Sequence, residues 1–203
     1  MQDNSFSKSD KISKWATNRY LNYKKQKKPE LRIKKVEDKN TTDVVINDIN
    51  YEMKVYSCVY RTPSIELKRL DSGKWSGWYQ GISDIVVCIQ GGYALYYNAQ
   101  KLKAHYDMGN IRTYTAYVSQ EKEGSSYKAP MQFLSIGEVS TSQASPFFPR
   151  YNWDNEWKRW DCSKLKNTDI GTPFLGYEDL RNIFQRDLET EYENYITNRS
   201  ILK

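Results

Sequence analysis

Two β-branched runs around a short polar break constrain the fold of this chain most. Residues 41–55, "TTDVVINDINYEMKV", contain the run "VVI", the break "NDIN" and a second run that begins at Tyr51. Strand-forming residues on both sides of such a break predict a β-hairpin. The second run also carries a carboxylate at Glu52 and an ammonium at Lys54. Charged side chains are rare in the core, so these two positions need a chemical explanation.

The register of this hairpin decides which side chains meet. The simplest register over "NDIN" pairs Ile46 with Tyr51 and places Asp43 opposite Lys54. Cross-strand partners share a face, as do alternate residues along a strand, so Asp43, Glu52 and Lys54 would point the same way. A three-residue loop would shift the register and separate them.

An acidic residue two positions before a lysine is not specific by itself. Four such triplets occur, and they begin at Glu37, Glu52, Glu66 and Glu156. The triplet at Glu52 differs because an aspartate stands on the neighbouring predicted strand. Two carboxylates are ligands that suit Mg²⁺, and a lysine beside them can orient water or offset charge on a phosphate. The alternative is an exposed Glu/Lys ion pair, which contributes little to stability.

Hydrophobic periodicity and turn residues predict the other elements. We expect helices at residues 9–26, at 99–106 with Asn98 as the N-cap, and at 177–196, the last an amphipathic helix that includes Tyr177 and Tyr195. The expected strands are 30–37, 43–46, 51–60, 64–70, 84–89, 93–98, 113–120 and 131–139. The segment "WDNEWKRW" predicts a helical face of Trp153, Trp157 and Trp160, which favours a core anchor over a base-stacking platform.

With this element order, residues 10–105 resemble the PD-(D/E)xK nuclease superfamily. The resemblance rests on "TDVVIND..YEMK" and on the buried strand "DIVVCI" that follows. It implies an α/β (α+β) fold, with a restriction-endonuclease-like mixed central sheet flanked by helices. It also implies that Asp43, Glu52 and the carbonyl of Met53 bind the metal and that Lys54 is catalytic. Thr42 replaces the proline of the motif.

The resemblance implies a Mg²⁺-dependent endonuclease of restriction or mobile-element and phage type that cleaves DNA, with Mn²⁺ as an alternative metal. The sequence does not distinguish DNA from RNA. An additional metal ligand would be Glu30 or Glu66, between which the sequence does not choose. Residues 1–111 would form the nuclease core. Residues 112–203 would form a C-terminal extension, packed on the core, for recognition or for a homodimer interface.

The positive charge is concentrated at the N-terminus. Residues 1–42 carry twelve Lys/Arg against five Asp/Glu, whereas the whole chain has a net charge of +6. Such asymmetry indicates a basic segment that faces a polyanion, the alternative being a solvated lysine-rich face. The expected nucleic-acid contacts are Lys24, Lys25, Lys27, Lys28, Lys34 and Lys35.

Cysteine, histidine and hydropathy patterns exclude several other classes. Three widely spaced cysteines and one histidine, His105, argue against a structural zinc site and favour a reducing compartment. Without an N-terminal apolar run, we expect a cytoplasmic protein with no membrane partner. Two other functions stay open: a catalytically inactive nucleic-acid-binding or inhibitor protein with the same fold, and an interaction module whose basic arm binds an acidic protein.

Overall fold

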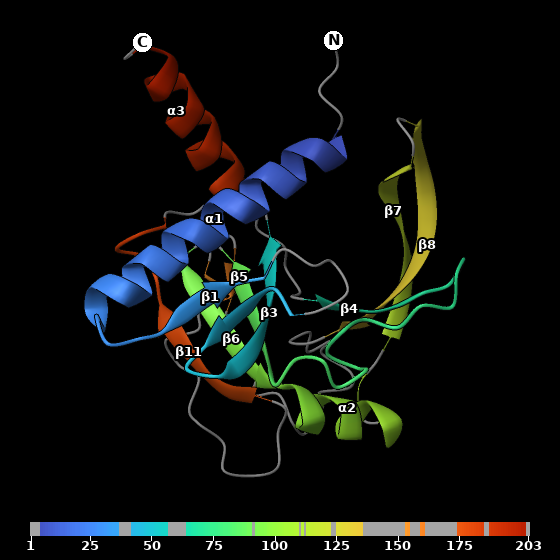
Figure 1. The fold of residues 1–203 in the computed structure, drawn as a ribbon. Helices are drawn as coiled ribbons and strands as arrows, with labels where there is room; N and C mark the ends of the chain where they lie inside the picture. The colour runs from blue at the N-terminus through green and yellow to red at the C-terminus, as the bar shows by residue number, and fades with distance from the viewer. Residues whose placement is uncertain are drawn as a thin grey trace.

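Within the residues that the structure describes, the fold consists of three helices and two main β-sheets (Figure 1). The helices are α1 (Ser5–Lys27), α2 (Ala99–Asp107) and α3 (Leu188–Ile201). The computed structural model describes residues 5–36, 42–56, 64–90, 92–109, 111, 113–122, 125–135, 153–154, 159–160, 174–184 and 187–201.

The main sheet has six strands in the order β1-β2-β3-β5-β6-β11. Only the pair β3–β5 is parallel, so the sheet is mixed. Together with the helices it confirms the predicted α+β class. The strands are β1 (Ile33–Lys35), β2 (Val44–Ile46), β3 (Ile49–Tyr56), β5 (Ile85–Gln90), β6 (Tyr93–Asn98) and β11 (Phe174–Asp179).

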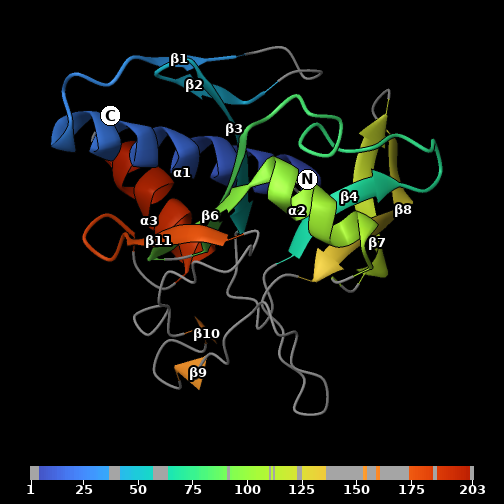
Figure 2. The same cartoon turned by 90° about the horizontal axis from the view of Figure 1, so that it is seen from below.

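A second sheet has the order β4-β8-β7 and is antiparallel. Its strands are β4 (Ser64–Arg69), β7 (Thr113–Lys122) and β8 (Ser125–Ser135). The pattern of residues 64–70 predicted a strand but not its partner, since period-two alternation does not say which sheet a strand joins. Figures 1 and 2 show this sheet and α3 lying well apart from each other.

Helix α1 covers one face of the main sheet. It buries Ile12, Ala16, Tyr20 and Leu21 at helical spacing, and Pro29 follows its last turn. These side chains share a core cluster with Met53, Val87 and Ile89 of the sheet and with Leu180, Phe184 and Leu188 near α3.

The opposite face of the main sheet packs on the second sheet and on α2. This core cluster contains Val86 and Cys88 from β5, Leu67 from β4 and Leu102 from α2. The predicted cap of α2 is confirmed, because the Asn98 side chain accepts a hydrogen bond of 2.9 Å from the Lys101 N–H. Because the two core clusters lie on opposite faces of the main sheet, successive residues along β3 and along β5 belong to different clusters.

Two sequence predictions for the C-terminal region are wrong. The helix predicted at 177–196 begins only at Leu188, because residues up to 179 pair with the edge of β6 as β11. Tyr195, expected on a core-facing stripe, is exposed, whereas the side chain of Tyr177 is outside the described part.

The expected tryptophan helix is also contradicted. Trp153 and Trp160 lie opposite each other on two short antiparallel strands, β9 (Trp153–Asp154) and β10 (Arg159–Trp160). Cross-strand pairing brings these tryptophans together as well as helical spacing would, so the spacing did not identify the element. Trp157 is outside the described residues.

Strand pairing crosses the expected division at residue 111 twice. Strand β4 pairs with β8, and β6 pairs with β11, so segments before and after the division share both sheets. Among the described residues, no helix is both long and apolar enough to cross a membrane.

Candidate active site

The β2–β3 hairpin turns over two residues. Asn47 and Asp48 both have positive φ angles, 49° and 66°, which is the geometry of the tight turns that join twisted strands. The pairing is Ile46 with Ile49, so the predicted register, with Ile46 opposite Tyr51, is wrong by two residues. The longer loop was expected because three of the four residues of "NDIN" are polar, but Ile49 and Asn50 belong to the strand.

An even shift keeps every side chain on its predicted face. When the observed register is continued beyond Val44, Asp43 lies level with Glu52 rather than with Lys54. The carboxylate of Asp43 accepts a hydrogen bond of 2.7 Å from the Met53 N–H. The structure therefore brings Asp43, Glu52 and Lys54 together, although in a different pairing.

Glu52 is a nearly buried carboxylate with two partners. Its residue is 8% exposed, and it lies on the sheet face opposite Met53 and α1. Its Oε1 forms an ion pair of 2.7 Å with Lys54 Nζ. Its Oε2 accepts a hydrogen bond of 2.8 Å from the Trp78 N–H. These contacts compensate for the lost hydration of the charge.

Lys54 is surrounded by negative charge. Burial by itself lowers the pKa of Lys54, but nearby carboxylates outweigh this effect and raise it above its usual range. These carboxylates belong, in order of electrostatic effect, to Glu52, Glu66 and Asp43. Lys54 is therefore a cation at neutral pH, suited to stabilising negative charge and not to accepting a proton.

Asp43 lies at the solvent side of this cluster. Partial loss of hydration raises the pKa of its carboxyl group, the Met53 N–H and Lys54 act in the opposite direction, and the charge of Glu52 raises it further. The residue as a whole remains exposed. A carboxylate that is accessible and incompletely hydrated is suited to binding a cation.

The second sheet contributes Glu66 to the group. Its negative charge acts on Lys54 from β4, whereas Glu30 is exposed in the turn that follows α1. Of the two additional carboxylates that the sequence left open, the structure therefore brings Glu66 to the site. We name Asp43, Glu52, Lys54 and Glu66 the carboxylate–lysine cluster.

The donor types and the charge of this cluster suit a divalent cation. With three carboxylates and one ammonium its formal charge is −2, and carboxylate oxygens are the ligands that Mg²⁺ prefers. N–H and C=O of one strand residue project from the same edge, so the Met53 carbonyl projects toward Asp43, which its N–H contacts. However, the described residues hold no group of three or more His, Cys, Asp or Glu side chains arranged around an ion position.

The connection between β4 and β5 forms one wall of the cluster. Trp78 is buried, its backbone N–H contacts Glu52, and its indole N–H donates to the Glu66 carbonyl at 2.8 Å. One residue thus ties together the two strands that carry the carboxylates. Sequence reasoning missed this role, and the available signal was the pair of tryptophans spaced around a glycine in "KWSGWYQG".

The same connection carries a stack of rings and ammonium groups. Trp75 and Tyr79 stack with centroids 4.2 Å apart and an interplanar angle of 18°. Lys68 Nζ lies 4.5 Å from the Trp75 centroid, and Lys103 Nζ lies 3.6 Å from the Tyr79 centroid. Each outer lysine therefore makes a cation–π contact. Lys103 also pairs with Asp107 at 3.1 Å, so one of the two ammonium groups already has a carboxylate partner.

The six lysines predicted to bind nucleic acid do not form one surface. Lys24 is turned inward to an ion pair of 2.9 Å with Glu178, and Lys25 donates to the Leu31 carbonyl at 2.6 Å. The others are Lys27, whose Nζ lies 5.8 Å from the Tyr23 ring centroid, and the exposed residues Lys28, Lys34 and Lys35.

The two lysines of β1 point to opposite faces of the sheet. Lys34 pairs with Val45, which places it on the face of Glu52, and Lys35 pairs with Val44, whose side chain belongs to the α1 core. Of the predicted basic residues on β1, Lys34 therefore shares a face with the carboxylate–lysine cluster.

Comparison with known proteins gives no relative for this chain. No protein-family model, curated protein or solved structure matches it.

Proposed function

We propose that this chain is a metal-dependent endonuclease that hydrolyses phosphodiester bonds of DNA. The observation that supports the proposal most is the carboxylate–lysine cluster, in which Lys54 pairs with Glu52 at 2.7 Å and the charges of Glu66 and Asp43 act on the same ammonium group. A charge-balanced ion pair would need one carboxylate. Three carboxylates leave a negative excess that a divalent cation offsets.

Asp43 and Glu52 would hold Mg²⁺ or Mn²⁺, with the Met53 carbonyl and Glu66 as further oxygen donors. When bound, the metal polarises the phosphate and lowers the pKa of a coordinated water. Lys54, kept cationic by its neighbours, offsets charge that develops on the phosphate. Lys34, on the sheet face that carries Glu52, and Lys68, on β4 with Glu66, would bind backbone phosphates of the substrate.

A catalytically inactive nucleic-acid-binding or inhibitor protein is the second candidate. It is favoured by the contacts of Glu52, both of whose oxygens are occupied by Lys54 and Trp78. In that case the cluster is a structural ion pair with two flanking acids. The two functions differ in whether a metal binds and whether a phosphodiester bond breaks.

A plasmid-nicking assay with and without Mg²⁺ tests the proposal. Asp43→Asn and Glu52→Gln should each reduce cleavage by about a hundredfold or more, because each removes a charged donor for the metal. Lys54→Ala should be similarly inactive yet still bind Mn²⁺, since an ammonium is not a ligand.

Matched controls are available on the same hairpin and on α2. Asp48→Asn makes the same chemical change at an exposed turn residue, and Lys101→Ala removes an exposed lysine. Both should cleave like the wild type. Equal activity of all five variants would exclude this site, and absence of Mg²⁺-dependent nicking by the wild type would favour the inactive alternative.

A further inference from the structure

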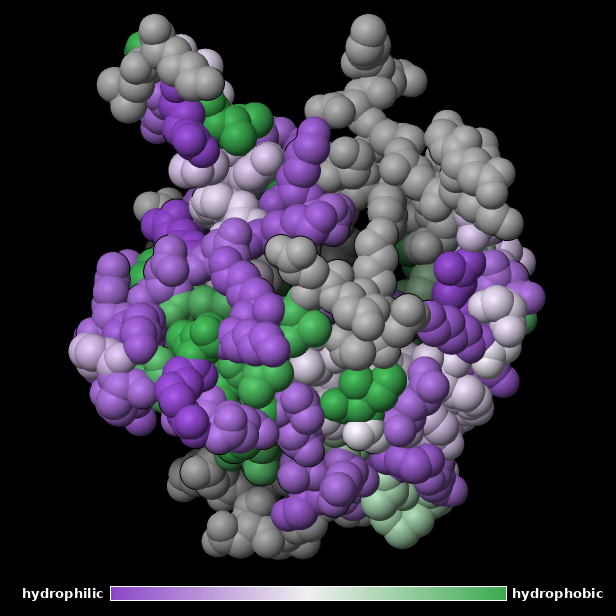
Figure 3. Space-filling model, viewed as in Figure 1, coloured by the Kyte–Doolittle hydropathy of each residue, from purple (hydrophilic) through white to green (hydrophobic). Residues whose placement is uncertain are grey.

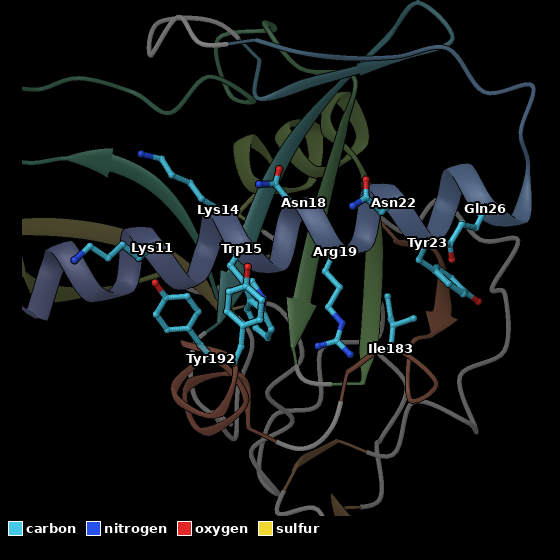
Figure 4. Close-up of a pocket in the computed structure, with 11 residues that line it drawn as sticks. Lys11, Lys14, Trp15, Asn18, Arg19, Asn22, Tyr23, Gln26, Ile183 and Tyr192 are labelled. Carbon is cyan, nitrogen blue, oxygen red and sulfur yellow. The ribbon is translucent and has the colours of Figure 1, made fainter. Parts of the chain in front are cut away.

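A groove of about 750 Å³ lies between α1 and α3, on the side of the main sheet opposite the carboxylate–lysine cluster. Figure 4 shows Lys14, Asn18 and Asn22 on one side of α1, and Trp15 and Arg19 on the side that faces Tyr192 and Ile183. The lining consists of Lys11, Lys14, Trp15, Asn18, Arg19, Asn22, Tyr23, Gln26, Ile183, Tyr192 and Tyr195.

The chemistry of this lining is cationic, aromatic and amide, with no carboxylate among the lining residues. Residues 11–28 of the chain contain seven Lys/Arg and no Asp or Glu. Figure 3 shows hydrophilic side chains over much of α1 on this face. Such a surface attracts an anion that also carries planar rings.

In the described part of the chain, the acidic residues beside the groove are already paired with basic ones: Asp10 with Lys14, Glu191 with Arg19, and both Glu189 and Glu193 with Lys8. Asp10 pairs with Lys14 at 2.7 Å, but both side chains are exposed, so a phosphate can replace the carboxylate at little cost. Glu191 lies 3.6 Å from Arg19. Lys11 makes no ion pair within the described part of the chain, which leaves one cation at the open end of the groove.

The aromatic wall distinguishes unpaired bases from a duplex. The Trp15 ring centroid lies 5.6 Å from that of Tyr192 and 5.9 Å from that of Tyr195, whose residue is 38% exposed. Aromatic side chains stack on bases only when the bases are not already stacked within a duplex. The exposed part of the Tyr195 ring can meet an unpaired base beside Arg199, which donates to the Tyr195 hydroxyl at 2.9 Å and lies 5.6 Å from the ring centroid.

The length of the groove distinguishes a strand from a mononucleotide. Lys11 and Gln26 are fifteen residues apart on α1, which corresponds to about 22 Å along the helix axis. The amides of Asn18, Asn22 and Gln26 recur every fourth residue along this line. An amide offers both a donor and an acceptor, the combination that pairs with base edges.

From these observations we propose that the α1–α3 groove binds a single-stranded nucleic-acid segment of a few nucleotides. Phosphates contact Lys11 and Lys14, base edges meet the amides, and one base stacks on Tyr195. The site is separate from the carboxylate–lysine cluster and does not depend on its proposed activity. It therefore gives the protein a second nucleic-acid contact on the far face of the sheet.

Fluorescence anisotropy of the full chain with a labelled mixed-sequence 12-mer, in EDTA, tests this inference. The double variant Lys11→Gln/Lys14→Gln should bind about tenfold more weakly, with a log–log salt slope lower by about 0.7 for each lost phosphate contact. Tyr195→Ala should lose about fivefold or more through stacking alone, with an unchanged salt slope.

A charge-matched control separates the groove from net charge. Lys101→Gln/Lys128→Gln removes two exposed lysines from α2 and β8, and it should bind within about twofold of the wild type because it leaves the groove intact. Each variant is first checked for an unchanged Tm.

Three results would overturn the inference. The first is a groove variant that folds and binds like the wild type, and the second is an equal loss in the control. The third is displacement of the oligonucleotide by free dAMP at the same nucleotide concentration, which would make the groove a mononucleotide site. Weaker binding of a duplex 12-mer than of the single strand supports the assignment.

Discussion

At the scale of single residues, the cluster around Lys54 brings several charged side chains together in a partly buried place, where like charges repel each other. Glu52 and Lys54 stabilise one another at 2.7 Å, while Asp43 and Glu66, which form no ion pair of their own within the described residues, add negative charge near Lys54. A fold selected only for stability would not keep extra carboxylates beside a buried pair. Their retention is the physical reason to look for a ligand.

Asp43 allows a prediction about stability and pH. Because its pKa is raised in the folded protein, ionised Asp43 disfavours folding at neutral pH, and this penalty disappears as the pH falls below the ordinary value of about 3.9. We expect Asp43→Asn to raise Tm slightly at pH 7 and to leave it unchanged near pH 3. Thermal unfolding at both pH values checks this, and a lower Tm at pH 7 contradicts it.

Lys54 allows a prediction about charge balance. Lys54→Met should lower the free energy of unfolding by about 1–3 kcal/mol, because Glu52 is left without its counterion. The double variant Glu52→Gln/Lys54→Met should recover part of this loss in urea unfolding while remaining inactive. If the double variant is less stable than the sum of the single changes, the two groups do not act as a pair.

At the scale of elements, the β2–β3 turn sets which residues face each other. Asn47 and Asp48 tolerate positive φ because a short polar side chain can bond locally, and Asn47 Oδ1 accepts a hydrogen bond of 2.9 Å from the Arg32 N–H. A Glu/Lys pair on β3 has its observed neighbours only when this turn has two residues.

Substitutions in the turn should therefore have opposite effects. Asn47→Ala should lower the free energy of unfolding by about 1–2 kcal/mol, since alanine is strained at positive φ. Asp48→Gly should be neutral or slightly stabilising, because glycine adopts this conformation without strain and the exposed pair with Arg32 contributes little. Urea unfolding measures both, and similar losses would show that the turn conformation is not the cause.

Local sequence patterns predicted the helices and strands better than they predicted which strands pair with each other. The hairpin, α1 and the capped α2 follow from alternation, helical spacing and Asn98, all of which are local. In the C-terminal region, Leu180, Phe184 and Leu188 recur every fourth residue and are all buried, yet only Leu188 is helical. The four-residue spacing therefore indicates which residues are buried but not that they are helical. Residues 174–179 form a strand because they pair with the edge of β6.

The candidate site, like the fold, was predictable from the sequence only where it depends on a local pattern. Asp43, Glu52 and Lys54 were found from the pattern of one hairpin, since alternation fixes a face even when the register is wrong by two. Glu66 could be named only as one of two alternatives, because its position depends on a strand in another sheet. Trp78 was not predicted, since its contact with Glu52 is made by a backbone N–H that any residue except proline carries, and its indole contact with Glu66 depends on a strand of the other sheet.

At the scale of the whole molecule, a polar network ties the N-terminal helix to the C-terminal strand. Tyr20 on α1 hydrogen-bonds Tyr96 on β6, and Tyr96 donates to Glu178 on β11. Lys24 on α1 also donates to Glu178 at 2.9 Å. The carboxylate thus serves two donors from different elements, and the segment after residue 174 completes the core under α1.

This arrangement predicts that residues 1–111 do not fold alone. Without residues 112–203, Leu180, Phe184 and Leu188 leave the α1 core, and β4 and β6 lose the partners β8 and β11. Loss of one large buried side chain costs about 2–5 kcal/mol, so three exhaust the roughly 5–15 kcal/mol that holds a domain together. We expect the 1–111 fragment to show no cooperative thermal transition by circular dichroism. A chain ending at residue 196, whose described losses are the exposed residues 197–201 of α3, is the control and should unfold cooperatively. A fragment that melts with the Tm of the full chain would mean that residues 112–203 are an appendage and that the cross-sheet pairing adds nothing to stability.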